Sequence, residues 1–175
     1  MGTRMISCAV LLAAAAGATT LQQLTVDDMI RQSTAIVHAK VTGSYSAFLG
    51  RTIYTHYQLQ IEENLTGTLA TAEAVVPGGA AKGLRQMAAG APTLAPGQDY
   101  VLFLWTSKSG LNHVMGLSQG LFNVMQDAAG NTVLVRPAAN SPMVNASGNV
   151  VSDSAVTIKL GDLKAEIQKV VGAGK

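Results

Sequence analysis

The stretch GLSQG, Gly116 to Gly120, matches the G-x-S-x-G pattern that carries the nucleophilic serine of many hydrolases. In that arrangement the serine stands on a sharp turn between a strand and a helix, and its histidine follows later in the chain. Here a strand pattern, LFNVMQD, follows Ser118, and all three histidines precede it. We therefore interpret GLSQG as a strand connection whose glycines permit a tight turn, with Ser118 as a weak candidate nucleophile.

The sequence also contains the residues of a second kind of catalytic triad in the right order. His56, Asp99 and Ser118 occur in the order His, Asp, Ser that trypsin-like proteases use. That fold needs two β-barrels, and a chain of 175 residues has room for about one. The sequence favours a non-enzymatic protein, and a serine hydrolase remains an alternative.

The histidines are candidate metal ligands, because imidazole binds Zn²⁺ and Cu²⁺ well. His38 and His56 fall on the polar faces of two segments that we expect to pair as strands, so their side chains could be neighbours. No carboxylate or second histidine stands at a recognised ligand spacing from either of them, or from His113. We predict no metal and no cofactor, and keep a metal-dependent hydrolase only as an alternative.

A long glycine- and proline-containing segment, residues 78–98, is the candidate binding loop. Loops of this length in a small domain are functional or mobile. Its start, PGGAAKG, lacks the G-x-x-x-x-G-K-[ST] spacing of a phosphate loop. Together with the polar strand face, it gives these predicted binding residues: His38, His56, Gln58, Gly78, Gly79 and Lys82. Gln60 extends the polar face, and Tyr54 could add an aromatic surface.

The elements that must position these residues alternate in a strand-like way. Thr25 and Asp28 predict a capped helix ending near Ser33. The next two segments alternate apolar and polar residues and predict an antiparallel pair that turns near Gly50. Further strand patterns are AEAVVP, DYVLFLW, LNHVMGL, GLFNVMQD, TVLVRP and residues 155–160, and DYVLFLW is expected at the sheet centre. A short helix is expected within residues 80–89, and GDLKAEIQKVV predicts an amphipathic C-terminal helix.

This pattern predicts a mainly β fold, either a small antiparallel OB-like β-barrel or a sandwich, with about seven strands. A short N-terminal helix and a C-terminal amphipathic helix complete it. We expect the barrel domain to span residues 19–137 and a polar linker to span 138–154. Residues 155–175 should supply a last strand and a helix that dock on the barrel.

The N-terminus has the features of a secretory signal peptide. Arg4 is followed by an apolar run from Ile6 to Ala16, and Ala16-Gly17-Ala18 offers a cleavage site. The expected cleaved segment is therefore residues 1–18. Cys8 is the only cysteine and lies within it, so the exported chain would have no disulfide and no thiolate catalyst. These features predict a secreted or periplasmic protein.

The charge balance excludes one class of partner. Twelve basic and ten acidic residues give a net charge of +2, without a basic groove for nucleic acid. No second apolar run is long enough to span a bilayer, so we expect no membrane-spanning segment after cleavage. The partner is expected to be a protein or a cell-envelope component.

Several short pieces occur in a recognisable order: QSTAIVHAKV, YQLQIEENLTG, VVPGG, AAGAPTLAPGQDYVLFL and GLSQGLFNV. This order resembles a group of uncharacterised exported bacterial proteins, over roughly residues 21–137. The resemblance implies a β-rich exported domain and brings no catalytic residue. More distantly, the expected fold is similar to the OB barrel of metalloproteinase inhibitors, which act through an N-terminal cysteine.

The sequence therefore predicts an exported, non-enzymatic binding or interaction module with an unknown ligand. Besides the hydrolases, an accessory or inhibitory domain for a secreted protease is an alternative. Because no cysteine remains after residue 18, such a domain would have to act through its loops alone.

Overall fold

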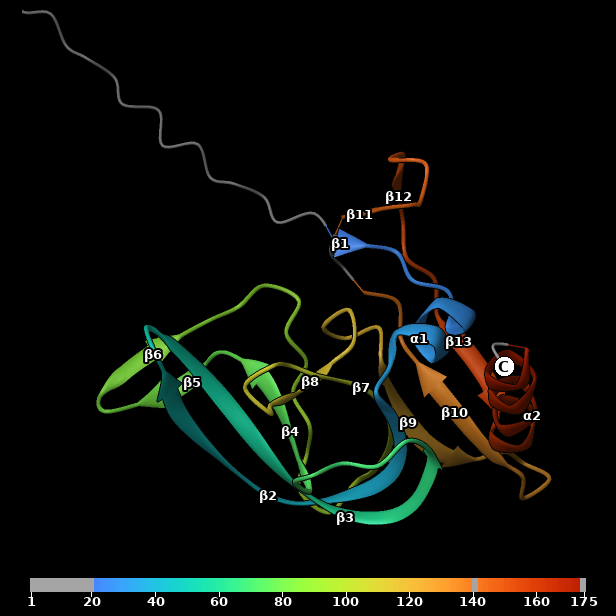
Figure 1. Ribbon diagram of the computed structural model, residues 1–175, viewed down its shortest axis with the longest axis horizontal. Helices are drawn as coiled ribbons and strands as arrows, with labels where there is room; N and C mark the ends of the chain where they lie inside the picture. Colours follow the sequence, from blue (N-terminus) through green and yellow to red (C-terminus); the bar gives the residue numbers. More distant parts are fainter. Residues whose placement is uncertain (1–20, 140–141, 174–175) are drawn as a thin grey trace, which may run out of the picture.

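A computed structural model describes residues 21–139 and 142–173, and within them the fold is mainly β (Figure 1). The predicted signal peptide lies outside the described residues. The elements, in chain order, are β1 (Leu21–Gln22), α1 (Val26–Gln32), β2 (Ala35–Leu49), β3 (Thr52–Thr66), β4 (Glu73–Pro77), β5 (Gly79–Ala81), β6 (Leu84–Gln86), β7 (Asp99–Thr106), β8 (Asn112–Val114), β9 (Leu121–Gln126), β10 (Thr132–Arg136), β11 (Met143–Val144), β12 (Val150–Val151), β13 (Val156–Lys159) and α2 (Leu160–Gly172).

The main sheet has eight strands in the order β13-β10-β9-β7-β2-β3-β4-β8. The last strand, β8, also pairs with β7, so that β7, β2, β3, β4 and β8 form a ring of pairings. The pairing of β4 with β8 consists of one residue pair, Val75 with His113. We call this side of the ring the β4–β8 seam, and because one pair holds it, the ring is not a closed barrel.

The predicted antiparallel pair is confirmed. β2 and β3 pair along their whole lengths, from Ile36 with Thr66 to Leu49 with Thr52. Gly50 makes the turn with a φ of 61°, a left-handed conformation that glycine adopts without strain. The long pair extends well past the rest of the sheet, and its distal end reaches β5 and β6 (Figure 1).

The sheet has a hydrophobic core on each face. Inside the ring, Val37, Leu59 and Leu102 belong to one buried cluster. On the opposite face, Phe103 and Phe122 pack against residues of α1 and α2 in a second cluster. The strand β7 contributes to both clusters, which explains why residues 100–105, YVLFLW, are apolar without interruption. Its predicted central place in the sheet is confirmed, since it lies between β9 and β2.

The helices α1 and α2 contact each other, and both pack against the second buried cluster. The predicted capping box of α1 is present: the Asp28 N–H donates to Thr25 Oγ1, and the Thr25 N–H donates to the Asp28 carboxylate. Along α2, Leu163, Ile167 and Val170 are buried at helical spacing against the same core. Before α2, β13 pairs with β10 at the edge of the main sheet.

Three expectations differ from the structure. The described residues form thirteen strands rather than about seven, because several connections contain strands of two or three residues. The helix predicted within residues 80–89 is wrong, since this stretch forms the antiparallel β5–β6 hairpin. Its turn lies at Lys82 and Gly83, which both have positive φ, and a helix cannot continue through that conformation.

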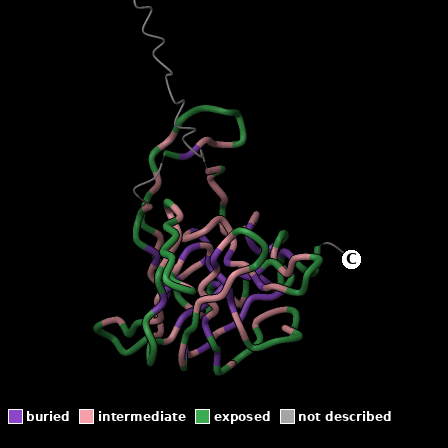
Figure 2. Tube along the Cα trace, turned by 90° about the vertical axis from the view of Figure 1, so that its left-hand side faces the viewer, coloured by how far each residue is buried: buried purple, intermediate pink, exposed green. Residues whose placement is uncertain are grey.

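The segment 138–154, expected to be a polar linker without secondary structure, contains the strands β11 and β12. They form a small sheet with β1, in which β1 and β11 run parallel. Figure 2 shows this part projecting from the buried body of the molecule. The segment is anchored near its ends, because the buried Arg136 forms an ion pair with Asp153.

Candidate functional site: an aromatic cavity at the seam of the ring

The GLSQG turn holds the N-terminal segment through Gln119. Gly116 and Leu117 both have positive φ, which produces the tight connection between β8 and β9. Gln119 is 1 % exposed, and its Oε1 accepts a 2.8 Å hydrogen bond from the Leu24 N–H. Its Nε2 donates to the Gln22 carbonyl oxygen over 2.9 Å. The motif therefore has a structural role, because the buried side-chain amide of Gln119 binds the backbone of the N-terminal segment.

Ser118 lies in the same turn without a base nearby. It lines a cavity of about 270 Å³ together with Thr93, Tyr100 and Arg136, and no histidine is among the described residues that line this cavity. Its hydroxyl forms no hydrogen bond with a histidine of the described chain. Among the described residues that line this cavity, none is a histidine or carboxylate that could serve as a general base for Ser118.

The structure separates His38 from His56. His38 lies opposite Glu63, whereas His56 lies opposite Tyr45, further along β2. At the usual rise of a strand, this offset separates the two positions by roughly 20 Å. They cannot share one metal ion, and residues 21–139 and 142–173 hold no group of three His, Cys, Asp or Glu side chains suited to one.

His56 instead belongs to a polar cluster on the outer face of the ring. Its ring stacks on that of Tyr45, with centroids 4.7 Å apart, and its Nδ1 lies 3.3 Å from Glu73 Oε2. The Tyr45 hydroxyl also donates to the Glu73 carboxylate. Burial, together with the charge of Glu73, raises the pKa of Tyr45. Gln58 is exposed beside this cluster, opposite Glu73.

The other predicted binding residues lie in different surroundings. Gly78 and Gly79 line a cavity of about 320 Å³ beneath the β5–β6 hairpin. A Cβ at Gly79 would lie 2.5 Å from Ser46 Oγ, so this glycine allows β5 to cross closely over β2. Lys82 is exposed at the hairpin turn, away from His38. The structure therefore does not bring the six predicted residues into one site.

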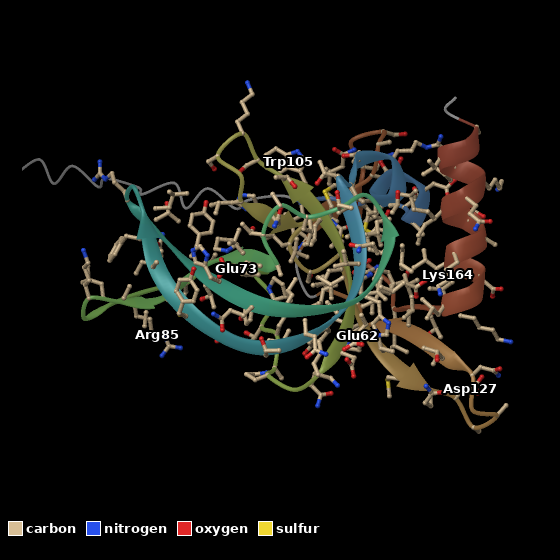
Figure 3. The ribbon with its side chains drawn as sticks, turned by 60° about the horizontal axis from the view of Figure 1, so that its bottom comes forward. Glu62, Glu73, Arg85, Trp105, Asp127 and Lys164 are labelled. Atoms are coloured by element: carbon tan, nitrogen blue, oxygen red, sulfur yellow. The ribbon has the colours of Figure 1, made fainter. Side chains whose placement is uncertain are left out.

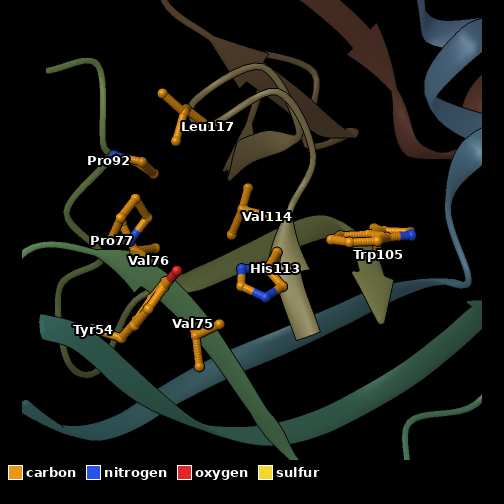
Figure 4. Close-up of a pocket in the computed structure, with 9 residues that line it drawn as sticks. All are labelled: Tyr54, Val75, Val76, Pro77, Pro92, Trp105, His113, Val114 and Leu117. Carbon is orange, nitrogen blue, oxygen red and sulfur yellow. The ribbon is translucent and has the colours of Figure 1, made fainter. Parts of the chain in front are cut away.

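An apolar hollow opens at the β4–β8 seam, and because three of its lining residues carry aromatic rings we call it the aromatic cavity (Figure 4). Its volume is about 190 Å³. It is lined by Tyr54, Val75, Val76, Pro77, Pro92, Trp105, His113, Val114 and Leu117, which come from β3, β4, β7, β8, the segment before β7 and the GLSQG turn.

Strand register brings its aromatic rings together. On the outer face, Val75 of β4 lies opposite His113 of β8, which lies opposite Trp105 of β7. The His113 ring is 5.5 Å from that of Trp105 and 5.8 Å from that of Tyr54, centroid to centroid, the latter edge-on. His113 thus stands between two aromatic rings that approach from different strands.

The lining of the aromatic cavity is mainly apolar, with the His113 imidazole, the Tyr54 hydroxyl and the Trp105 indole N–H as its polar side-chain groups. Burial lowers the pKa of His113 below its usual value of 6.5, so its imidazole is neutral at neutral pH. A neutral imidazole offers one N–H donor and one acceptor nitrogen. Trp105 is 48 % exposed and forms a wall that solvent and ligand can both reach.

The aromatic cavity adjoins the other two. Pro92 lines all three, and Thr93 lines the one that contains Gly78 and the one that contains Ser118. The irregular segment before β7 therefore forms a shared wall. Of the predicted binding loop, residues 78–98, the aromatic cavity is lined by Pro92 and by none of the glycines.

Sequence reasoning named Tyr54 as a possible ligand surface but missed Trp105 and Pro92, and it treated His113 only as a possible metal ligand. One signal was available: alternation along DYVLFLW places the single tryptophan of the chain on the side opposite Leu104. Its proximity to His113 depends on the pairing of β7 with β8, which the pattern alone does not specify.

In comparisons with known proteins, no family model, no curated sequence and no solved structure matches the chain. The resemblance to exported bacterial proteins thus stays a prediction. Within residues 21–139 and 142–173, no helix is long and apolar enough to cross a bilayer.

Proposed function

We propose that this protein is an exported, non-enzymatic binding module built on an OB-like β-barrel, with the aromatic cavity as its ligand site. The ring of five strands, held at its seam by one residue pair, supports the barrel assignment, because OB barrels are five-stranded and partly open. The apolar N-terminal run supports export. The aromatic cavity is the single observation that carries the binding function.

The size and lining of the aromatic cavity define the ligand class. An apolar protein cavity of about 150 Å³ holds a benzene-sized molecule, and this one measures about 190 Å³. Its aromatic and proline walls favour a flat or cyclic apolar group. We expect the bound group to be a single ring, either free or as a side chain of a protein partner.

The polar members of the site add orientation rather than reactivity. The neutral His113 can form one hydrogen bond with a substituent on the ring, which fixes the direction of the ligand. No serine, threonine, cysteine, lysine or carboxylate is among the described lining residues, since the other walls are Val, Pro, Leu, Tyr and Trp. This composition supports binding over hydrolysis.

Ligand-observed NMR with toluene and indole tests the proposal. Both should bind to the unmodified chain, and Trp105→Ala should weaken binding about tenfold, because an aromatic pair and its buried area contribute about 1.4 kcal/mol. Met125→Ala is the matched control, since Met125 is 52 % exposed on β9 and lies outside the cavity. Equal affinity of both variants, or no binding to the unmodified chain, would contradict the proposal.

A further inference from the structure

Two hairpin turns lie at the end of the molecule opposite α2. One joins β2 to β3 at Gly50, and the other joins β5 to β6 at Lys82 and Gly83. The hairpins are connected, because the Ile53 N–H donates a 2.7 Å hydrogen bond to Gln86 Oε1. Figure 3 shows Arg85 of this end and Lys164 of α2 on opposite sides of the structure. We call residues 44–56 and 77–87 the arm.

The arm exposes large apolar side chains. Met87 is 85 % exposed, Leu84 is 62 % exposed, and Leu49 beside the β2–β3 turn is 48 % exposed. With Tyr45 they make up half of the large hydrophobic side chains that the described chain leaves exposed. Exposed apolar side chains gathered at one projecting end are a feature of interaction surfaces.

The arm is also purely cationic. Arg51, Lys82 and Arg85 are exposed, and the arm contains no Asp or Glu. No carboxylate of the described residues forms an ion pair with these three cations, although five other cations of the described chain are paired: Arg31, Lys40, Arg136, Lys164 and Lys169. The nearby Glu73 is held by Tyr45 and His56.

We propose that the arm docks on an anionic lipid bilayer, with Leu49, Leu84 and Met87 entering the interface and the three cations meeting lipid headgroups. Apolar side chains flanked by Lys and Arg bind membrane interfaces in this way, each cation contributing through the negative surface potential. The arm projects from the body as two hairpin ends, and a broad flat surface meets such ends more completely than a protein pocket does (Figure 1). This inference goes beyond the aromatic cavity and does not depend on it.

Vesicle co-sedimentation tests the inference with a chain that begins at Thr19, because the apolar run Ile6–Ala16 would bind lipid by itself. The buried hydrophobic residues of the described chain all lie between Met29 and Val170, so the shortened chain keeps the whole core. Vesicles containing phosphatidylglycerol are compared with vesicles of phosphatidylcholine alone. We expect preferential binding to the anionic vesicles, weakened by added salt.

Two sets of substitutions locate the contact. Replacing Arg51, Lys82 and Arg85 with Gln should weaken binding about 100-fold, since each cation near the surface contributes about fivefold. The double variant Leu84→Ser with Met87→Ser should weaken it by at least tenfold. The matched controls, Lys108→Gln with Lys159→Gln and Met125→Ser with Val150→Ser, change exposed residues outside the arm and should bind like the parent chain.

Several results would overturn the inference. One is equal binding to both kinds of vesicle, and another is equal loss in the arm and control variants. Binding to soluble polyglutamate as tight as to vesicles, unaffected by Leu84→Ser with Met87→Ser, would assign the arm to an acidic protein instead. None of these outcomes bears on toluene binding, so failure here is distinct from failure at the aromatic cavity.

Discussion

Two neighbouring residues of the GLSQG turn have opposite environments. Gln119 is buried with both ends of its amide bonded to the backbone of residues 22 and 24, whereas Ser118 borders an open cavity. A buried amide that satisfies backbone groups is expensive to remove, because its partners are left unpaired. The residue that gives the motif its apparent chemistry is therefore less important to the molecule than the one beside it.

Replacing Gln119 with Ala should lower the free energy of unfolding by about 2 kcal/mol, the cost of leaving two buried backbone groups unpaired. Denaturant unfolding followed by circular dichroism measures it. Ser118→Ala is the matched control and should change stability by less than about 0.5 kcal/mol. The reverse order of effects, or loss of an esterase activity in Ser118→Ala alone, would contradict the structural interpretation of GLSQG.

His113 should make the aromatic cavity sensitive to acid. Burial lowers the pKa of His113 in the folded state below 6.5, so the unfolded state binds more protons in the range just below that value. The free energy of unfolding should therefore fall as pH drops through about 6.5 towards the lowered pKa. Toluene binding should weaken over the same range, because protonation places a charge in the cavity.

Titration of the His113 ring by NMR measures this directly, and His113→Gln should remove its part of the pH dependence of stability. A titration midpoint at or above 6.5 would show that burial does not control this imidazole.

At the scale of elements, periodicity predicted most strands and both terminal helices. The antiparallel pair, the central strand and the capping box of α1 follow from alternation and local residue types, and the structure confirms them. The β5–β6 hairpin and the strands β11 and β12 were missed. They contain two or three residues each, too few for a period to appear.

The segment 138–154 also depends on a contact that no local pattern reveals. The side chain of Asp153 is 1 % exposed and pairs with the buried Arg136, and it accepts a hydrogen bond from the Ala139 N–H. Burial alone would raise the pKa of Asp153, but the hydrogen bonds and charge of its partners hold it below 3.8. This ion pair fixes the segment to the end of β10.

Asp153→Asn should lower the free energy of unfolding by about 3 kcal/mol, because it leaves the Arg136 charge buried without a counterion. In the parent chain, the contribution of this pair should persist at neutral pH and be lost as pH falls below about 3.8 and through the lowered pKa. Thermal unfolding across pH measures both effects. Asp127→Asn is the control, because Asp127 is a half-buried turn residue that accepts hydrogen bonds within its own turn and forms no ion pair with a cation of the described residues. Equal destabilisation by both changes would contradict the anchoring role.

At the scale of the whole molecule, two cores share one sheet. The first cluster fills the ring and the second lies beneath α1 and α2, with β7 common to both. The aromatic cavity is lined by strands of the ring and by two adjoining loops. The arm, at the far end of β2 and β3, lies away from the helices (Figure 1). The helices therefore cover one half of the sheet, and both surfaces that we propose for binding lie outside that half.

The candidate site was harder to predict than the fold, because it depends on which strands are neighbours and on how their residues are paired. Tyr54 is far from Trp105 and His113 in the sequence, and the three rings meet only through the order β3-β4-β8-β7. Alternation predicts the face on which a residue lies but not which strand becomes its neighbour. For the same reason His38 and His56, predicted as possible neighbours, lie opposite different partners.

The central claim is that the aromatic cavity binds a single-ring group. The most direct measurement is the set of intermolecular NOEs between toluene and the isotope-labelled protein. We expect NOEs to the Trp105 indole and to the rings of His113 and Tyr54, because these line the cavity. Contacts confined to Leu49, Leu84 and Met87 of the arm or to the helices, with none to Trp105 or His113, would contradict the claim.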